Sequence, residues 1–221
     1  MTSHDLKCIF IHFPRTAGSS IEKFLMGTDD IYGPKSSVYR NKDDVEKKIV
    51  ENHHTSASDY VKQNGQEIWQ EYFTFSFVRN PWDWFVSNFF WDLFQYERAK
   101  SENRPIKYRR QFIVNDCGSD FSTYVKKGAE RPDWFVFTQV TDFIGNPDFI
   151  GRFENLESDV KSICKKLNVD YKDFPYENKT NRTKYTDYYD NETANIVYNL
   201  FKKDIESVLL KYSTTTTEYK N

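Results

Sequence analysis

The feature that most constrains the fold of this chain is an alternating apolar segment that leads directly into a helix. Aromatic side chains occupy every second position of residues 72–78, which is typical of a buried strand. Asn80 and Pro81 follow, and an asparagine cap before a proline at the first helical position favours a helix start. Large apolar side chains then recur at steps of three and four through residues 82–94, so the sequence predicts an amphipathic helix packed against a core.

A second strand-to-helix junction lies near the start of the sequence. Residues 8–13 are a short run of apolar, β-branched and aromatic side chains, which indicates another buried strand. A turn containing Gly18 follows, and residues 19–25 have the pattern of a helix with a serine at its start. The same patterns predict a surface loop or lid at 98–110, a strand at 149–153, and helices at 43–50, 56–62, 119–127, 156–167 and 190–209.

Strands and helices alternate without an internal repeat or linker, which predicts an α/β fold. We expect one domain over residues 1–212 and a flexible tail over residues 213–221. The chain has 221 residues with 18% aromatic side chains, enough for a substantial buried core.

The charge and the cysteines narrow the class of protein further. The formal charge is −2, which argues against broad nucleic-acid binding but allows a local anion site. The sequence shows no secretory signal and no apolar run of about 18 residues, so we expect a cytoplasmic protein without a membrane span. Three widely spaced cysteines indicate neither a disulfide framework nor a zinc site.

The turn of the first junction has the residue types of a phosphate or sulfate cradle. A loop that enters a helix presents backbone N–H groups and the positive end of the helix dipole. Ala17 and Gly18 lie in the middle of this turn, and Gly18 allows a close approach of the backbone. Thr16, Ser19 and Ser20 supply hydroxyl groups, and Arg15 adds a cation. The pattern is not a Walker A loop, and an ordinary capped turn is the alternative interpretation.

The second junction places a cation at the end of its strand and a hydroxyl in its helix. Arg79 follows residues 72–78, and Ser87 lies about two helical turns further on. A guanidinium and a hydroxyl that converge on one phosphate suit this spacing. The alternatives are a surface ion pair for Arg79 and a small residue at a helix contact for Ser87. In an open α/β sheet, both junctions belong to the carboxyl edge, where ligands bind.

Taken together, these segments resemble the sulfotransferases that use 3′-phosphoadenosine-5′-phosphosulfate, and the branch acting on carbohydrates in particular. Residues 14–20, Pro-Arg-Thr-Ala-Gly-Ser-Ser, are similar to that family's 5′-phosphosulfate loop, Pro-Lys-Thr-Ala-Gly-Thr-Ser. Its 3′-phosphate motif, Arg-Asn-Pro-x-Asp-x-x-x-Ser, matches residues 79–87. Residues 150–156 and 178–205 are similar to later blocks of the family, so the resemblance covers residues 8–212.

The resemblance implies a three-layer fold with a central parallel sheet flanked by helices, similar to that of P-loop nucleotide-binding proteins. It implies 3′-phosphoadenosine-5′-phosphosulfate as donor, 3′-phosphoadenosine-5′-phosphate as product, and no metal. Arg15 stands where the family has a lysine; it keeps the charge but is too basic to donate a proton. The resemblance further implies that the basic loop containing Lys179 and Arg182 folds over the nucleotide, with a solvated loop as the alternative.

A histidine is the expected base for an acceptor hydroxyl. The segment from His54 to Ala57 looks like the family's His-x-x-Ala element, which favours His54, with His53 as the second candidate. Two exposed loop histidines are the alternative. We expect His4 to lie near a loose terminus and His12 to be packed within the first strand.

The sequence leaves the acceptor and the oligomeric state open. A carbohydrate or small alcohol is expected from the branch resemblance, and a lipid or a protein tyrosine remains an alternative. Two other classes use a similar cradle, a phosphotransferase of the P-loop type and a non-catalytic module that binds a nucleotide. Magnesium-dependent ATP binding would favour the first of these, and nucleotide binding without transfer would favour the second.

Overall fold

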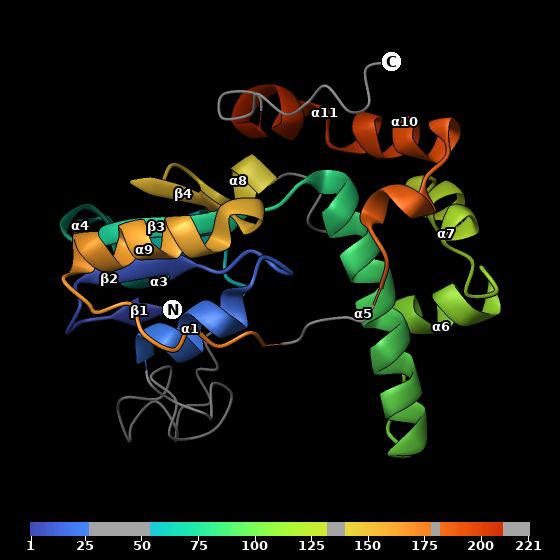
Figure 1. Cartoon of the computed structure of the whole chain (residues 1–221), viewed down its shortest axis with the longest axis horizontal. Coiled ribbons are helices and arrows are strands. Elements are labelled where there is room, and N and C mark those ends of the chain that lie inside the picture. The colour runs from blue at the N-terminus through green and yellow to red at the C-terminus, as the bar shows by residue number, and fades with distance from the viewer. Residues whose placement is uncertain (27–53, 132–139, 178–181, 210–221) are drawn as a thin grey trace. The chain divides into compact units, whose positions relative to one another are not determined.

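The structure, a computed structural model, consists of two compact units. The first unit comprises Met1–Arg79 and Asp142–Lys179, and the second comprises Asn80–Thr141 and Thr180–Asn221. No helix in the described part of the chain is both long and apolar enough to cross a membrane. The structure describes residues 1–26, 54–131, 140–177 and 182–209 (Figure 1).

The first unit contains a sheet of four strands in the order β1–β2–β3–β4. Its three longer strands, β2 (Cys8–Ile11), β3 (Phe73–Val78) and β4 (Phe149–Arg152), are parallel neighbours and confirm the three predicted strands. The edge strand β1 (Thr2–Ser3) was not predicted, because two residues are too few to show an alternating pattern. It pairs antiparallel with β2, so the sheet is mixed rather than entirely parallel.

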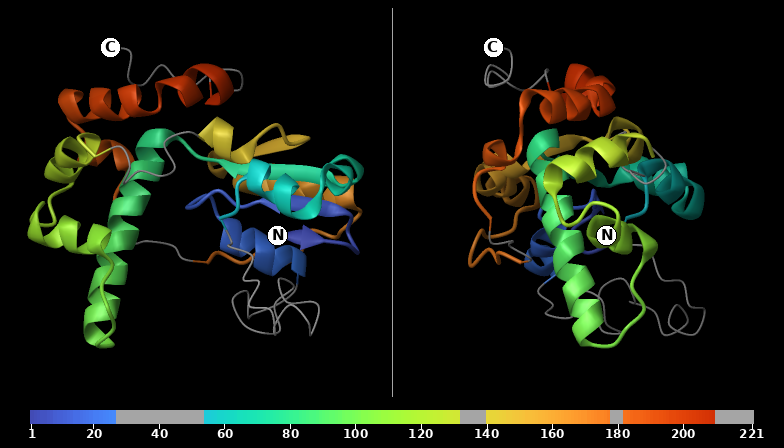
Figure 2. Two further views of the ribbon diagram at one scale, coloured as in Figure 1. Left: turned by 180° about the vertical axis from the view of Figure 1, so that it is seen from behind. Right: turned by 90° about the vertical axis from the view of Figure 1, so that its right-hand side faces the viewer.

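Helices flank the sheet of the first unit. Figure 1 shows α9 (Leu156–Leu167) in front of the strands, and Figure 2 shows α3 (Ala57–Asn64) on the opposite face. The predicted helix at 156–167 is confirmed with the same bounds. The other helices of this unit are α1 (Gly18–Met26), α4 (Gln66–Glu71) and the 3₁₀ turn η3 (Phe153–Asn155).

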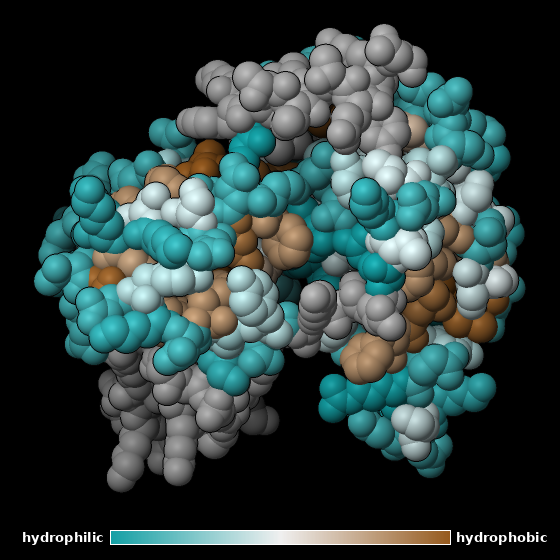
Figure 3. Space-filling model, in the orientation of Figure 1, coloured by the Kyte–Doolittle hydropathy of each residue, from teal (hydrophilic) through white to brown (hydrophobic). Residues whose placement is uncertain are grey.

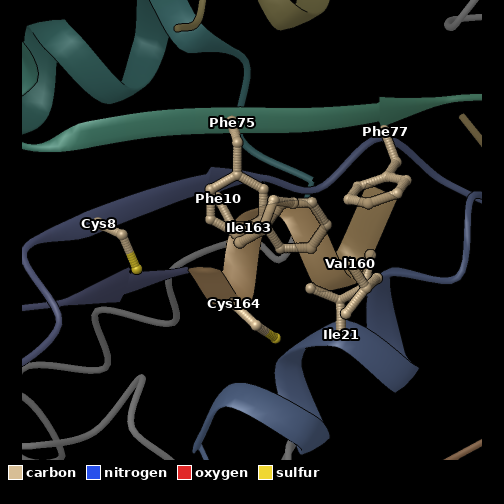
Figure 4. Packing of buried hydrophobic residues seen from close by; sticks show 8 residues of the cluster. All are labelled: Cys8, Phe10, Ile21, Phe75, Phe77, Val160, Ile163 and Cys164. Carbon is tan, nitrogen blue, oxygen red and sulfur yellow. The ribbon is translucent and has the colours of Figure 1, made fainter. Parts of the chain in front are cut away.

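A hydrophobic core lies between the strands and two of these helices, α1 and α9. The rings of Phe10 on β2 and Phe75 on β3 stack with their centroids 5.0 Å apart. Burial of such large apolar side chains is the main driving force for this packing. The cluster, shown in Figure 4, consists of Cys8, Phe10, Ile21, Phe75, Phe77, Val160, Ile163 and Cys164.

The second unit is helical in its described part, and α5 (Pro81–Ser101) is its longest helix. Asn80 caps α5 by accepting from the N–H groups of Trp82 and Asp83, as the asparagine–proline start predicts. The chain passes from this unit to the first within α8 (Val140–Ile144). The other elements of the second unit are α6 (Tyr108–Asn115), α7 (Phe121–Ala129), η4 (Tyr185–Tyr188), α10 (Asn191–Leu200), α11 (Lys202–Asp204) and the π-helical turn η5 (Ile205–Leu209).

The predicted apolar stripe of α5 is buried in its first half and emerges in its second. Phe85 and Phe89 are buried and contact Tyr124 of α7 with ring centroids 5.5 and 5.2 Å apart. Phe94 is 54% exposed, and Figure 3 shows hydrophobic side chains on the viewed face of this unit, over α5 and α6. The amphipathic pattern therefore describes the first part of the helix better than its end.

Two predictions on the second unit are corrected by the structure. The expected surface loop at 98–110 is helical at both ends, because α5 continues to Ser101 and α6 begins at Tyr108, and only residues 102–107 between them are non-helical. Arg98 donates to Glu102 one turn later, and a cation near a helix C-terminus favours this extension. The predicted helix at 190–209 is broken at Phe201 into three shorter elements. The predicted helix at 43–50 and tail at 213–221 lie outside the described residues.

Candidate active site

The turn that joins β2 to α1 has an unusual backbone conformation. Arg15 has φ of 62° and Ala17 has φ of 66°, values that residues with a Cβ adopt infrequently. Thr16 lies between them, is completely buried, and donates through its hydroxyl to the carbonyl of Phe13 at 2.7 Å. Such positive values of φ concentrate at functional sites, where the surrounding structure holds them in place. We call residues 14–20 the donor loop.

The donor loop ends at the N-terminus of α1. The N–H of Ile21 donates to the carbonyl of Ala17 at 3.0 Å, and this hydrogen bond lies at the beginning of α1. The N–H groups of residues 18–20 therefore precede it, at the positive end of the helix dipole, where an anion is stabilised. Ser20 is buried, and its Oγ accepts from the N–H of Glu177 at 2.9 Å, so the loop is also tied to the end of the segment that follows α9.

Arg79, at the end of β3, is fixed against the donor loop. Its Nη1 donates to the carbonyl of Arg15 at 2.9 Å, and its guanidinium lies 3.8 Å from the ring centroid of Phe153. Only 8% of Arg79 is exposed. The prediction that both junctions belong to one sheet edge is thus met for Arg15 and Arg79, because β2 and β3 are adjacent parallel strands.

His54 lies beside His12, two residues before the donor loop, in the first unit. Its Nδ1 is 3.1 Å from the carbonyl oxygen of His12, which accepts hydrogen bonds and cannot donate them, so Nδ1 carries a proton. In the neutral imidazole the lone pair is then on Nε2, as a general base requires. His54 is half-buried, which the alternative of two exposed loop histidines did not anticipate. His53, the other candidate, lies outside the described residues.

The remaining predicted site residues belong to the second unit or lie outside the described residues. Ser87 is 1% exposed on α5. Arg182 forms an ion pair with Asp83 through Nη2 and Oδ1, and both side chains are 12% exposed. Lys179 lies outside the described residues. Because these residues are in the second unit or undescribed, the predicted convergence of Arg79 and Ser87 on one phosphate stays a prediction.

Among the described residues, no group of three or more His, Cys, Asp or Glu side chains could hold a metal ion. The three cysteines are buried, and burial raises the pKa of the Cys8 thiol to about 11, which leaves little thiolate at neutral pH.

Sequence reasoning missed three side chains that contact this site. The ring of Phe153 lies under Arg79, and His12 and Glu22 form a buried pair next to Gly18. His12 was expected to be packed, and it is, but against the donor loop. The position of His12, two residues before the loop, was the signal in the sequence that could have indicated this contact. The sequence around Phe153 contains no such signal, because Arg79 is 74 residues away.

Comparisons with known proteins place the chain in the sulfotransferase family. The family model described as "Sulfotransferase family" matches residues 1–213, and the chain therefore belongs to this family. One relative, a protein of Archaeoglobus fulgidus described as uncharacterized, is 30% identical over 109 residues, which are 48% of this chain and 75% of the relative. No solved structure matches the chain.

Proposed function

We propose that the protein transfers a sulfuryl group from 3′-phosphoadenosine-5′-phosphosulfate to an acceptor hydroxyl, and that the donor loop holds the 5′-phosphosulfate. Membership of the sulfotransferase family supports the type of reaction. The observation that carries the assignment of the loop is the contact of Arg79 with the Arg15 carbonyl, because it joins the two phosphate-binding motifs at one sheet edge.

The donor loop has the chemistry that a phosphosulfate requires. Backbone N–H groups of residues 18–20 and the positive end of α1 attract an anion without adding a mobile side chain. Arg15 is half-buried and supplies a permanent positive charge with several donors in a plane. Arg15 is itself part of the donor loop, where the negative charge that develops on the leaving phosphate oxygen needs stabilisation.

We propose His54 as the general base of an in-line displacement. Nε2 of His54 accepts the proton of the acceptor hydroxyl, whose oxygen forms the new bond to sulfur. The bond between sulfur and the bridging phosphate oxygen breaks, and 3′-phosphoadenosine-5′-phosphate leaves with that oxygen's negative charge. Arg15 stabilises this charge electrostatically, since arginine is not a proton donor at neutral pH. The fixed Nδ1 proton of His54 supports this role.

The 3′-phosphate of the donor is proposed to bind the second motif. Arg79 and Ser87 are its expected ligands, with Lys179 and Arg182 as further cations from the C-terminal part. The ion pair of Arg182 with Asp83 supports this proposal, because it holds the guanidinium next to the N-terminus of α5. An anion near that helix end is stabilised by the helix dipole.

The finer predictions on fold, acceptor and location belong to the same proposal. We propose that the mixed sheet with its flanking helices is the core of a three-layer, P-loop-like fold, and that residues 1–212 act as one domain. The sheet order and the family match support the α/β core. A carbohydrate or small alcohol as acceptor, and a cytoplasmic location, stay predictions.

The transfer itself is tested with donor labelled in its sulfate group. Purified protein is incubated with this donor and a panel of simple sugars, oligosaccharides and small alcohols, and labelled products are separated from the donor. We expect transfer to at least one hydroxyl compound without added metal. Binding of 3′-phosphoadenosine-5′-phosphate without transfer to any acceptor favours a non-catalytic module, and magnesium-dependent binding of ATP favours a phosphotransferase.

A further inference from the structure

His12, which the proposed mechanism does not use, lies at the centre of the contacts around the donor loop. Its side chain is 4% exposed and follows directly after β2. The imidazole Nδ1 lies 3.2 Å from Oε1 of Glu22 on α1, and the Glu22 side chain is also 4% exposed. Because a carboxylate accepts, Nδ1 of His12 is the donor. A carboxylate this deeply buried requires such a hydrogen-bonding partner.

The other edge of the same ring touches the donor loop. A Cβ atom placed on Gly18 would lie 1.9 Å from Nε2 of His12, far inside contact distance. The imidazole therefore occupies the space that a side chain at residue 18 would need. The glycine is required here because the ring of His12 packs directly against the loop backbone, and the ring in turn sets how far the loop is able to move inward.

The backbone of His12 contacts the proposed base. Its carbonyl oxygen accepts from Nδ1 of His54 at 3.1 Å, and the two imidazoles meet edge to face with centroids 4.7 Å apart. On its opposite side the His12 ring stacks on Phe10 at 5.5 Å, with planes 16° apart. One residue thus contacts the donor loop, the first helix and the proposed base, and Phe10 holds it in place.

The Glu22 carboxylate creates an electrostatic problem for a loop that binds an anion. Glu22 lies one helical turn beyond Gly18, on the helix whose N-terminus is proposed to face the phosphosulfate. A buried negative charge at this distance opposes a second anion, because screening is weak inside a protein. The N–H that His12 donates to Oε1 stabilises the carboxylate, and a hydrogen bond to a charged acceptor offsets part of its negative charge.

We propose that His12 is a positioning residue for the donor site. Its ring and its carbonyl fix the donor loop and His54 relative to each other, and its hydrogen bond offsets the negative charge of Glu22 near the bound donor. This proposal rests on the proposed function, since it concerns the same donor site. An apolar ring of similar size at residue 12 fills the space over Gly18 but removes the N–H that His12 donates to Glu22. The electrostatic part of the role therefore predicts a specific interaction between residues 12 and 22.

The experiment is a double-mutant cycle of His12→Phe and Glu22→Gln, with the affinity for 3′-phosphoadenosine-5′-phosphate measured by calorimetry. We expect His12→Phe alone to weaken binding by about tenfold or more, because it removes the hydrogen bond that His12 donates to a buried carboxylate. Glu22→Gln in the same chain is expected to restore much of this loss, since the negative charge that this hydrogen bond offsets is then absent. Such non-additivity is expected for residues in direct contact.

His12→Asn and His4→Phe complete the design. His12→Asn keeps an N–H donor toward Glu22 and is expected to retain more affinity than His12→Phe. If His12→Phe does not fold, the affinity of His12→Asn relative to wild type and to Glu22→Gln tests the same hydrogen bond. His4 is a matched control, because its Nδ1 makes a 2.7 Å contact with the Tyr72 hydroxyl instead of with the loop. Melting temperatures of all variants separate a loss of binding from a loss of folding.

Failure of this proposal differs from failure of the proposed function. Unchanged affinity in His12→Phe, additive effects in the cycle, or losses of affinity that follow melting temperature alone would overturn the positioning role while the wild-type protein still binds. A wild-type protein that neither binds 3′-phosphoadenosine-5′-phosphate nor transfers sulfate would overturn the proposed function, and the role of His12 with it.

Discussion

The guanidinium of Arg79 donates a 2.9 Å hydrogen bond to the backbone carbonyl of Arg15, a residue 64 positions earlier in the chain. This contact joins the ends of two adjacent parallel strands, β2 and β3. It also bonds a residue whose φ is 62°, so Arg79 helps to hold the donor loop in an infrequent conformation. A residue that the sequence assigned to the 3′-phosphate thus also shapes the site proposed for the 5′-phosphosulfate.

Replacement of Arg79 is therefore expected to remove a phosphate contact and also to loosen the donor loop. Both effects weaken the binding of 3′-phosphoadenosine-5′-phosphate, the product formed from the donor. We expect Arg79→Ala to reduce the affinity for 3′-phosphoadenosine-5′-phosphate by at least about 10- to 100-fold, the usual range for a charge-assisted hydrogen bond. Calorimetry measures this affinity directly. Arg131→Ala is the matched control, because Arg131 also lies over a phenylalanine ring, that of Phe112 at 5.3 Å, but is not among the residues proposed to bind the donor. Equal affinities of Arg79→Ala and wild type would contradict the assignment.

Removal of the proposed base is expected to separate catalysis from binding. We expect His54→Ala to lower turnover by ~10²–10⁴-fold while the affinity for 3′-phosphoadenosine-5′-phosphate persists. Turnover is measured by sulfate transfer at saturating donor and acceptor, with His4→Ala as a histidine control. Unchanged turnover in His54→Ala would remove His54 from the mechanism and return attention to His53.

An added methyl group on the donor loop is expected to disturb the ring of His12. Gly18→Ala places a Cβ atom 1.9 Å from Nε2 of His12, so either the ring or the loop must move. We expect a loss of about 1–3 kcal/mol in the free energy of unfolding, as for other overpacked sites, together with weaker donor-product binding. Gly118→Ala is the control for donor-product affinity, because its Cβ atom meets nothing within 4 Å, whereas its φ of 58° strains an alanine and lowers stability by itself. A Gly18→Ala protein with wild-type stability and affinity would show that the contact is easily relieved.

The strands and the first turn of α5 were predictable because their signals are local. Alternating aromatics indicate β3, and asparagine followed by proline indicates the start of α5, whatever the rest of the chain does. The expectation that Arg15 and Arg79 lie at the same edge followed from the rule that ligands bind at the carboxyl edge of parallel strands. The pairing of β2 with β3 is a finding of the structure. The donor-loop residues could accordingly be named from the sequence.

The contacts that were missed depend on tertiary structure. Phe153 approaches Arg79 because β4 pairs with β3, a register that neither segment shows by itself. The first residues of α6, 108–110, were assigned to a loop because residues 98–110 are polar and basic, yet Arg109 and Arg110 both pair with Asp92, which is 1% exposed on α5. An ion pair of this kind compensates the burial of a carboxylate and is invisible to a search for apolar periodicity.

The buried cysteines are expected to be inert in the folded protein. Burial raises the pKa of Cys8 and that of Cys117 to about 11 each, so little thiolate is present at about pH 8. A thiol with a raised pKa in the folded state makes stability fall as the pH rises above the usual thiol value. We expect slow labelling by a disulfide reagent in buffer and rapid labelling of all thiols in denaturant. Fast labelling of the native protein would contradict the burial of these side chains.

Low pH is expected to destabilise the N-terminus of α10. Asp190 caps this helix, and its hydrogen bonds from Thr193, first from the backbone and then from the side chain, hold the pKa of the carboxyl below its usual value. Because the pKa of Asp190 is lower in the folded than in the unfolded chain, its carboxylate stabilises the fold at any pH above the unfolded-state pKa. This contribution is lost as the pH falls through the folded-state pKa. Asp190→Ala should thus lower the melting temperature at neutral pH and have a smaller effect in acid. Asp187→Ala serves as the control, and an Asp190→Ala effect that is independent of pH would argue against the charged cap.

The central claim, that residues 14–20 form the donor site of a sulfotransferase, is tested most directly by calorimetric titration with 3′-phosphoadenosine-5′-phosphate. Wild type, Arg15→Ala and Arg79→Ala are compared in buffer without metal, and ATP with magnesium is titrated in parallel. We predict saturable binding of one molecule per chain to wild type, clear weakening in both variants, and weaker binding of magnesium ATP. Absence of binding to wild type, or equal affinity in all three proteins, would contradict the account.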